Sequence, residues 1–191
     1  MPEPSSADPI APDIVRTFVA AGHSDLATVQ TLLAQHPTLL NVGHEWRPGD
    51  IETAVQAAAH VGNRPIAEFL LGQGAQLSIC TAAMLGRADE VDRLLADDPA
   101  RIGEPGAHGI PLLAHAALSG DADLVASLHG RGAREGVSFA LHNAARRGIE
   151  PIVRYLLAND TPDLAWQDFQ GKTAREVAEA GGHSAVVALL D

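Results

Sequence analysis

One stretch of the chain, Phe139 to Asn159 (FALHNAARRGIEPIVRYLLAN), carries two apolar helical patterns separated by a glycine. Leu141, Ala144 and Ala145 stand at positions i, i+3 and i+4, so they share one face of a first helix. Gly148 is suited to end that helix, because glycine adopts a positive φ at low cost. After the glycine the same apolar spacing returns. The stretch predicts an antiparallel helix pair whose apolar side needs neighbours of its own kind.

Such neighbours recur along the whole chain. Each predicted second helix carries a leucine, and the gaps between successive leucines are 38, 24, 34, 28 and 34 residues. Long and short gaps alternate, and two consecutive gaps make 62 residues both before and after Leu94. The pattern indicates six helix pairs in which every second junction is shortened. The leucines are Leu32, Leu70, Leu94, Leu128, Leu156 and Leu190.

The helix pair resembles the ankyrin repeat, whose usual form is TPLHLAAxxGHxxVVxLLLxxGA. The resemblance extends over about Asp13 to Asp191 and implies an all-α, ankyrin-type helical solenoid of about six repeats, some with shortened hairpin fingers. The last repeat carries charged residues on its first helix, as expected where a solenoid ends against solvent. The residues that match the pattern are Ala140, Leu141, His142, Ala144, Ala145, Gly148, Val153, Leu156 and Leu157.

Residues 1–12 are predicted to form a flexible leader, and residues 13–191 a single solenoid domain. The leader lacks the basic start and the apolar centre of a signal peptide. Cys80 is the only cysteine, so no disulfide can form within the chain. These features favour a cytoplasmic protein, and the single lysine among 13 basic residues favours a bacterial one. A net charge of -11 argues against nucleic-acid and membrane partners, and we expect a monomer.

Candidate binding residues were derived from one face of the first helices. The residues five, two and one positions before each turn glycine share this face. In the family it lines the concave groove, and in the middle repeats of this chain it carries polar groups over an apolar floor, as ligand sites do. The two histidines on this face are His60 and His115. The predicted binding residues on it are Thr81, Met84, Leu118, Asn143, Arg146 and Arg147.

The two arginines have two possible roles. Arg146 and Arg147 could hold a carboxylate or a phosphate, because a guanidinium binds such groups through two parallel hydrogen bonds. Alternatively, they could pair with acidic residues of the neighbouring repeat.

The predicted fingers and the long connection Asn41–Asp50 supply further candidates. Trp46, Arg47, His108 and Phe169 are predicted partner-binding residues, since tryptophan and arginine often dominate interfaces. The connection around Trp46 could instead pack back onto the second repeat or close over one end of the groove.

Two principal functions are compatible with these residues. The first is a binding module that recognises a protein partner through its groove and fingers. The alternative is a small-molecule enzyme without a cofactor, an isomerase, dehydratase, lyase or cyclase, in which His115 and His60 act as acid and base. Arg147 would then anchor a small anionic substrate. A structural adaptor or inhibitor is a third class, and no metal site is expected, because the sequence holds no HExxH or CxxC motif and no close His/Asp cluster.

Overall fold

A computed structural model describes residues 10–191 of the chain. Most of the predicted leader, residues 1–9, lies outside the described residues. The first helix, α1, already begins at Pro12, within the stretch that was predicted to be leader. Proline suits this place, because the first turn of a helix leaves its backbone N–H groups unpaired and proline has none to lose.

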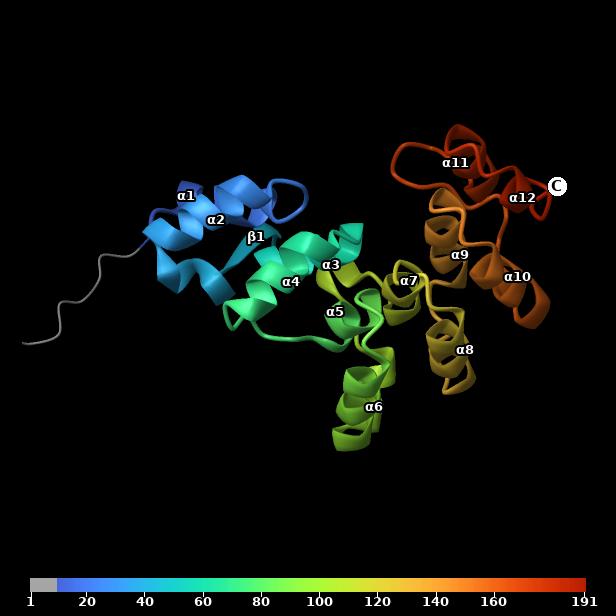
Figure 1. Ribbon diagram of the computed structural model, residues 1–191, viewed down its shortest axis with the longest axis horizontal. Coiled ribbons are helices and arrows are strands. Elements are labelled where there is room, and N and C mark those ends of the chain that lie inside the picture. The colour runs from blue at the N-terminus through green and yellow to red at the C-terminus, as the bar shows by residue number, and fades with distance from the viewer. Residues whose placement is uncertain (1–9) are drawn as a thin grey trace, which may run out of the picture.

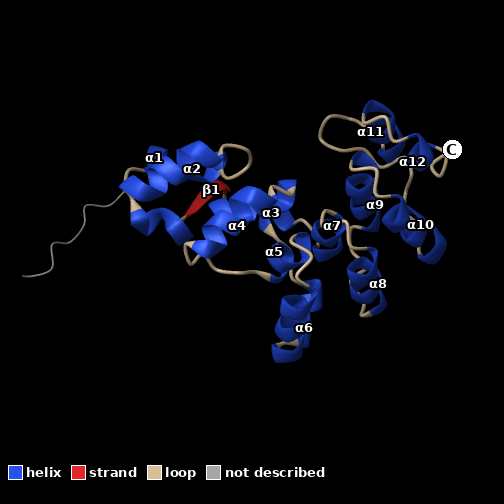
Figure 2. Cartoon of the chain, in the orientation of Figure 1, coloured by secondary structure: helices blue, strands red, loops and turns tan. Residues whose placement is uncertain are grey.

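The described residues form twelve short α-helices in six antiparallel pairs (Figures 1 and 2). Among residues 10–191 no helix is both long enough and apolar enough to cross a bilayer. Three 3-10 helices, η1 to η3, lie in the connections at Pro37–Asn41, Pro99–Gly103 and Ala107–Gly109. The pairs are α1 (Pro12–Ala21) with α2 (Leu26–Gln35), α3 (Ala54–Val61) with α4 (Arg64–Gly72), α5 (Ile79–Met84) with α6 (Ala88–Asp97), α7 (Leu112–Ala117) with α8 (Ala122–Gly130), α9 (Val137–Arg146) with α10 (Glu150–Asn159), and α11 (Ala174–Ala180) with α12 (Ser184–Val187).

The first helices of the pairs form one continuous row. Helix α1 packs on α3, α3 on α5, and so on through α7 and α9 to α11. The second helices stand beside this row, with α2 against α4, and α8 and α12 both against α10. The chain therefore advances through the stack from one end to the other (Figure 1). This arrangement confirms the predicted all-α, ankyrin-type repeat fold.

The core consists of two apolar clusters along the row. One cluster joins α1 to α4 and reaches Met84, Leu85 and Leu118, and the other continues from α5 to the last helix pair. Most of the anchor leucines are buried as expected. At the two ends the pattern shifts: Leu33, rather than Leu32, enters the core, and Leu190 lies beyond the last residue of α12.

The long first connection forms a β-hairpin. Strand β1 (Gly43–Arg47) pairs antiparallel with β2 (Asp50–Thr53), and the turn between them is Pro48-Gly49. Gly49 has a φ of 83°, which glycine adopts without steric cost. The register shifts between Glu45 and Arg47, so Trp46 lies in a bulge. A bulge re-aims the side chain it carries, and Trp46 turns back toward β2.

The hairpin leads directly into α3 through a capping box. The Thr53 hydroxyl accepts a hydrogen bond from the Gln56 backbone, and the Gln56 side chain accepts one from the Thr53 backbone N–H. Reciprocal bonds of this kind satisfy two of the unpaired donors at a helix start. They fix the residue before the cap, Glu52, against the first turn of α3. The sequence showed Gln56 where the family has a histidine, and the capping box is the physical reason why glutamine serves there.

Candidate functional site

A mostly apolar groove of about 710 Å³ runs along the row of first helices. It is bordered by the turn after α1, the ends of α3, α7 and α9, the finger at η3 and the connection before α11. The groove has a histidine-rich end, an apolar middle, and an end with arginines and aromatic rings. In that order, its lining residues are His23, His60 and His108; Val61, Ile110 and Leu118; and Phe139, His142, Asn143, Arg146, Arg147, Trp166, Asp168 and Phe169.

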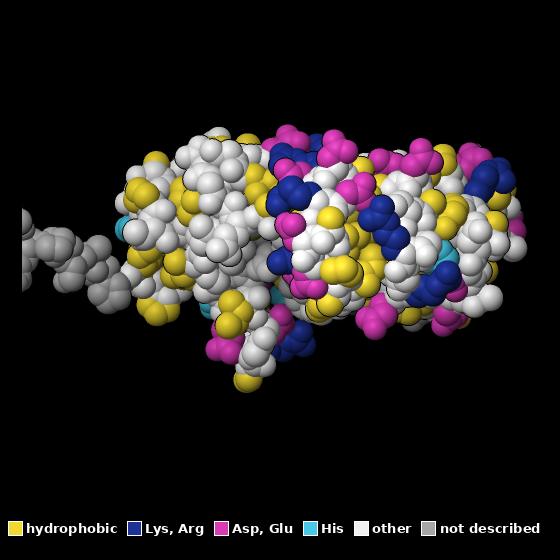
Figure 3. Space-filling model, turned by 90° about the horizontal axis from the view of Figure 1, so that it is seen from below, with side chains coloured by type: hydrophobic (Ala, Val, Ile, Leu, Met, Phe, Trp, Pro, Cys, Tyr) yellow, Lys and Arg dark blue, Asp and Glu magenta, His cyan; other side chains and the backbone are white. Residues whose placement is uncertain are grey.

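A different surface is seen in Figure 3, which views the molecule from below, the side on which α6 and α8 lie in Figure 1. Basic and acidic side chains alternate over its C-terminal half, with scattered hydrophobic groups between them. Among the ion pairs of the described residues are Arg93 with Glu90 on α6, and Arg131 with Asp92. Exposed pairs of this kind contribute little to stability.

Arg147 ties three helix pairs together across the groove. It follows α9, and its guanidinium donates hydrogen bonds to the backbone oxygens of Leu118, Val61 and Gly62, at 3.4, 3.2 and 3.1 Å. No carboxylate of residues 10–191 forms an ion pair with it. Partial burial, and after that the nearby charge of Arg64, lower the pKa of Arg147. The positive charge is therefore held in the groove by carbonyl groups alone.

Gly62 permits this close approach. It ends α3 with a φ of 71°, and a Cβ built on it would lie 2.1 Å from the Arg147 Nη2. Gly86 ends α5 in nearly the same conformation, φ 67°, but its Cβ would meet the Ser119 Cβ at an ordinary 3.6 Å. The two glycines are thus matched in backbone conformation and differ in what faces them.

We expect Gly62→Ala to destabilise the protein more than Gly86→Ala. Both changes place a Cβ in the left-handed region, which costs about 1–2 kcal/mol. Gly62→Ala also displaces the Arg147 guanidinium, and each lost hydrogen bond adds about 0.5–1.5 kcal/mol. Urea unfolding measures both losses. In an Arg147→Ala background the two glycine variants should become equivalent, and a difference that persisted there would contradict the contact.

Arg146 pairs with an acidic residue of the neighbouring repeat, which is the second of the two roles considered for it. Its Nη2 lies 2.6 Å from the Asp168 Oδ2, on the finger of the neighbouring repeat. Burial raises the pKa of Asp168, but hydrogen bonds from the backbone N–H groups of Lys172 and Gln170, together with the charges of His142 and Arg146, lower it overall. Arg146 therefore faces the groove as one half of an ion pair.

Aromatic rings form the floor and the rim at this end. Phe139 stacks on Trp166 with ring centroids 5.1 Å apart, and the same indole meets the His142 ring edge-on. Phe169, on the last finger, is 94% exposed. A phenylalanine held almost entirely in solvent beside an apolar groove marks a surface suited to binding.

Three of the predicted groove residues are buried and do not line the groove. Thr81 and Met84 are residues of α5 whose side chains are buried in the core. The Thr81 hydroxyl lies 2.9 Å from that of Ser78, the N-cap of this helix. His115 is 1% exposed, its Nδ1 donates to the Pro111 oxygen at 3.1 Å, and Gly106 covers its Cε1 and Nε2 atoms. The prediction that His115 faces the groove is wrong. The finger before α7, which carries Gly106, lies over the ring.

Burial has a direct electrostatic consequence for His115. Desolvation, only partly offset by the Pro111 bond, lowers the pKa of this imidazole to about 4. His115 is therefore neutral at pH 7 and closed off from the groove. Two other predicted residues, Leu118 and Asn143, do line the groove, although Asn143 uses its amide to donate to the Ala114 oxygen at 3.0 Å.

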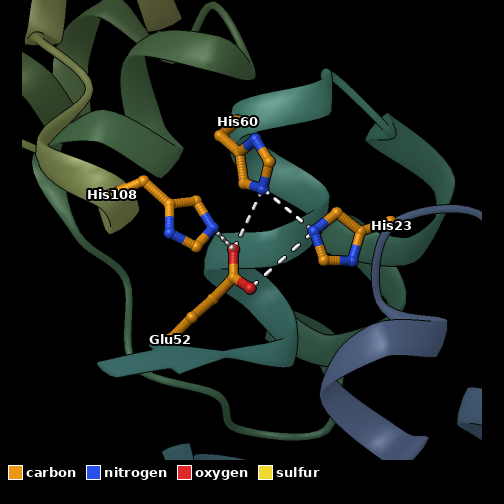
Figure 4. Close-up of side chains that lie close together, drawn as sticks. All are labelled: His23, Glu52, His60 and His108. Atoms are coloured by element: carbon orange, nitrogen blue, oxygen red, sulfur yellow. Dashed lines mark hydrogen bonds and ion pairs between the residues drawn. The ribbon is translucent and has the colours of Figure 1, made fainter. Parts of the chain in front are cut away.

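The other end of the groove holds a cluster of three histidines around one glutamate (Figure 4). Glu52 comes from β2, His60 from the last turn of α3, His23 from the turn after α1, and His108 from η3. One ligand atom from each side chain lies within 4.8 Å of the others. These four form the histidine–glutamate cluster.

Trp46 and Arg47 support this end rather than lining the groove. Trp46 Nε1 donates to the Glu52 Oε2 at 2.7 Å, so the ring packs back against the hairpin. Arg47 is exposed and pairs with Asp50 at 3.1 Å. Neither residue reaches the groove lining, and their predicted role in partner binding remains a prediction.

The cluster was not predicted from the sequence, because its members are far apart in the chain. His23 lies in the first repeat, outside the middle repeats that supplied the candidates, and Glu52 lies just after the long connection Asn41–Asp50. One signal was available: Asp50 and Glu52 stand at i and i+2 of a strand, so they share one face. No spacing rule, however, could have placed His108 opposite them. The cluster also supplies candidate metal ligands where no metal site was predicted.

A row of helix pairs with a groove along the first helices defines a helical repeat protein. Residues 113–191 match the family model of ankyrin repeats, in three copies. The match spans α7 to α12, which are three of the six helix pairs, so this part of the chain is similar to ankyrin repeats. A comparison with curated proteins found no match to this chain. Ankyrin repeats are in general protein–protein interaction modules.

Proposed function

We propose that the protein binds a segment of a protein partner in the groove. The observation that carries this proposal is an apolar groove with Phe169 in solvent at its rim and the Arg147 charge held inside it without a carboxylate partner among residues 10–191. Large aromatic groups and arginine are the residue types that most often dominate interfaces.

The groove also indicates what the partner carries. Val61, Ile110 and Leu118 offer a floor for one large apolar side chain. Arg147 offers a charge whose remaining donors suit a carboxylate, because an arginine–carboxylate pair forms charge-assisted hydrogen bonds. The proposed ligand is therefore a peptide segment with an apolar anchor and an acidic residue close to it.

The enzyme hypothesis receives less support from the geometry. It required His60 and His115 to face one substrate as acid and base. His60 lines the groove, but His115 is buried beneath Gly106 and stays neutral. A general acid or base must come within hydrogen-bonding reach of the proton it transfers. We therefore do not carry this pair forward as a catalytic site.

Peptide selection tests the binding proposal. A displayed library of short random peptides is selected against the full chain, and enriched peptides are measured against variants by calorimetry. We expect enriched sequences to combine a large apolar residue with Asp or Glu. Phe169→Ala and Leu118→Asp should each weaken binding about 30-fold or more, as for a hot spot of about 2 kcal/mol. Arg147→Ala should remove the preference for the acidic residue.

Leu164→Ala is the matched control, because Leu164 is also an exposed hydrophobic residue on the same connection but does not line the groove. Its affinity for the selected peptides should equal that of the unmodified chain. If peptides bind the Leu118→Asp variant as tightly as the unmodified chain, the groove is not the binding site. Circular dichroism and urea unfolding establish first that each variant is folded.

A further inference from the structure

We propose that the histidine–glutamate cluster is a binding site for one divalent transition-metal ion, with His23, His60 and His108 as nitrogen ligands and Glu52 as the oxygen ligand. The proposal concerns the end of the groove near the hairpin. It does not depend on what the rest of the groove binds.

The four side chains converge on one point from different elements (Figure 4). His60 Nε2 lies 3.0 Å from the His23 Nε2 and 3.0 Å from the Glu52 Oε1. His108 Nε2 lies 3.3 Å from the same Oε1, and His23 Nε2 lies 3.7 Å from the Oε2. With metal–nitrogen and metal–oxygen bonds of about 2.0–2.2 Å, neighbouring ligands of a tetrahedral ion stand about 3.3 Å apart. The cluster matches this spacing within a few tenths of an ångström at its closest contacts.

The hydrogen bonds on the far side of two rings fix which nitrogen carries the proton. His108 Nδ1 lies 3.0 Å from both carboxylate oxygens of Asp50, and His23 Nδ1 lies 3.0 Å from the Ala20 oxygen. Carboxylate and carbonyl oxygens only accept, so in both rings the Nδ1 donates. In a neutral imidazole the inward-facing Nε2 then carries a lone pair. Two of the three inward nitrogens are thus prepared as metal ligands.

This arrangement leaves electron pairs facing one another. The His108 Nε2 lone pair is directed at a carboxylate oxygen, which also has only lone pairs to offer. Glu52 is 0% exposed, and its Oε1 has only the His60 and His108 Nε2 atoms near it, at 3.0 and 3.3 Å, without a well-formed hydrogen bond to either among residues 10–191. A buried carboxylate oxygen without a well-formed hydrogen bond is unfavourable in the interior. A cation bound between the nitrogens and Oε1 removes both problems at once.

The proposed ligands are held by hydrogen bonds to neighbouring groups of the kinds found around known metal sites. A histidine that binds a metal commonly donates its other N–H to a carboxylate or a backbone carbonyl, which fixes the ring and raises its basicity. Asp50 does this for His108, and the Ala20 oxygen does it for His23. Trp46 holds the second oxygen of Glu52 at 2.7 Å, which leaves Oε1 for the ion. Asp50 and Trp46 are positioning residues in this proposal.

Three imidazoles and one carboxylate define the class of ion. Imidazole nitrogen suits zinc, copper, iron and nickel, whereas calcium and magnesium require mainly oxygen ligands. The ligands come from the first two helix pairs, the finger at η3 and the hairpin, so the ion would join segments that are 85 residues apart, from His23 to His108. The three histidines also line the groove, which places the ion where a bound segment could reach it.

Metal titration of the full chain tests the proposal. The protein is treated with a chelator, dialysed, and titrated with Zn²⁺ by calorimetry, and with Co²⁺ by visible absorption. We expect one ion per chain, a higher unfolding temperature with Zn²⁺, and a Co²⁺ absorption band typical of low-coordinate nitrogen and oxygen ligands. Glu52→Gln and His60→Ala should weaken binding more than about 100-fold, and Asp50→Asn about 10–100-fold, as for positioning residues at metal sites.

Glu135→Gln and His36→Ala are the matched controls, because they remove the same side-chain types outside the cluster and should bind the ion like the unmodified chain. Circular dichroism of each variant without metal separates loss of ligand from loss of fold. The proposal is overturned if the unmodified chain shows no saturable binding of one ion. It is equally overturned if folded Glu52→Gln protein binds Zn²⁺ with unchanged affinity, because Glu52 is then not a ligand of the ion.

Discussion

Leu156→Ala is expected to lower the free energy of unfolding by about 2–5 kcal/mol. Leu156 lies on α10, is fully buried, and belongs to the cluster that runs from α5 to the end of the chain. Removing its side chain loses apolar burial and leaves a cavity, since helix pairs on both sides restrict how far the site can collapse. Urea unfolding followed by circular dichroism measures the loss.

Leu190→Ala and Leu164→Ala are the comparisons for this prediction. Leu190 holds the corresponding place in the last pair, where only one neighbouring pair contributes packing, so its loss should be clearly smaller. Leu164 is exposed, and its replacement should change stability by no more than about 0.5 kcal/mol. Equal losses at Leu156 and Leu190 would contradict a core built only from contacts between adjacent pairs.

The second large effect is a loss of stability in mild acid that depends on His115. Its pKa is about 4 in the folded protein, against an ordinary value of 6.5 that applies after unfolding. Between these values the unfolded chain binds a proton that the folded chain does not, so stability falls as the pH decreases from 6.5 to 4. The contribution is fully present above pH 6.5 and amounts to about 3 kcal/mol, by order of magnitude.

The variant His115→Leu isolates this effect. It keeps an apolar side chain in the buried place but cannot be protonated. The stability of the unmodified chain relative to the variant should decrease by about 3 kcal/mol between pH 6.5 and pH 4. Above pH 6.5 the difference between the two proteins should be constant. A difference independent of pH over the whole range would show that the imidazole is not closed off from water as the structure describes.

Much of the fold follows from local sequence, because helix pairs of this kind are specified by short-range patterns. The apolar spacing around Leu141 and Leu156, and the glycine between them, predict a helix pair without knowledge of the rest of the chain. Repetition then predicts the stack, since each pair buries its apolar face only on a similar neighbour. The alternation of long and short junctions is likewise visible in the sequence.

The orientation of side chains toward the groove was predicted with less success. The positional rule correctly placed His60, Leu118, Asn143, Arg146 and Arg147 on the groove lining. It was wrong for Thr81, Met84 and His115. These three belong to α5 and α7, the short first helices on either side of the finger that carries Gly106 and His108. The rule assumes a regular stack, and the irregular fingers change which side chains remain accessible.

The sequence alone determined the helix pairs, their number and their order, because these depend on contacts between residues three or four positions apart and between adjacent repeats. Only the tertiary structure decided the histidine–glutamate cluster and the span of Arg147 to Gly62. The cluster depends on where the hairpin and the finger at η3 meet the ends of α1 and α3, and the Arg147 contact depends on how close the ends of α9 and α3 come. Such distances arise from the summed geometry of several helix pairs, and no spacing between residues in the chain encodes them.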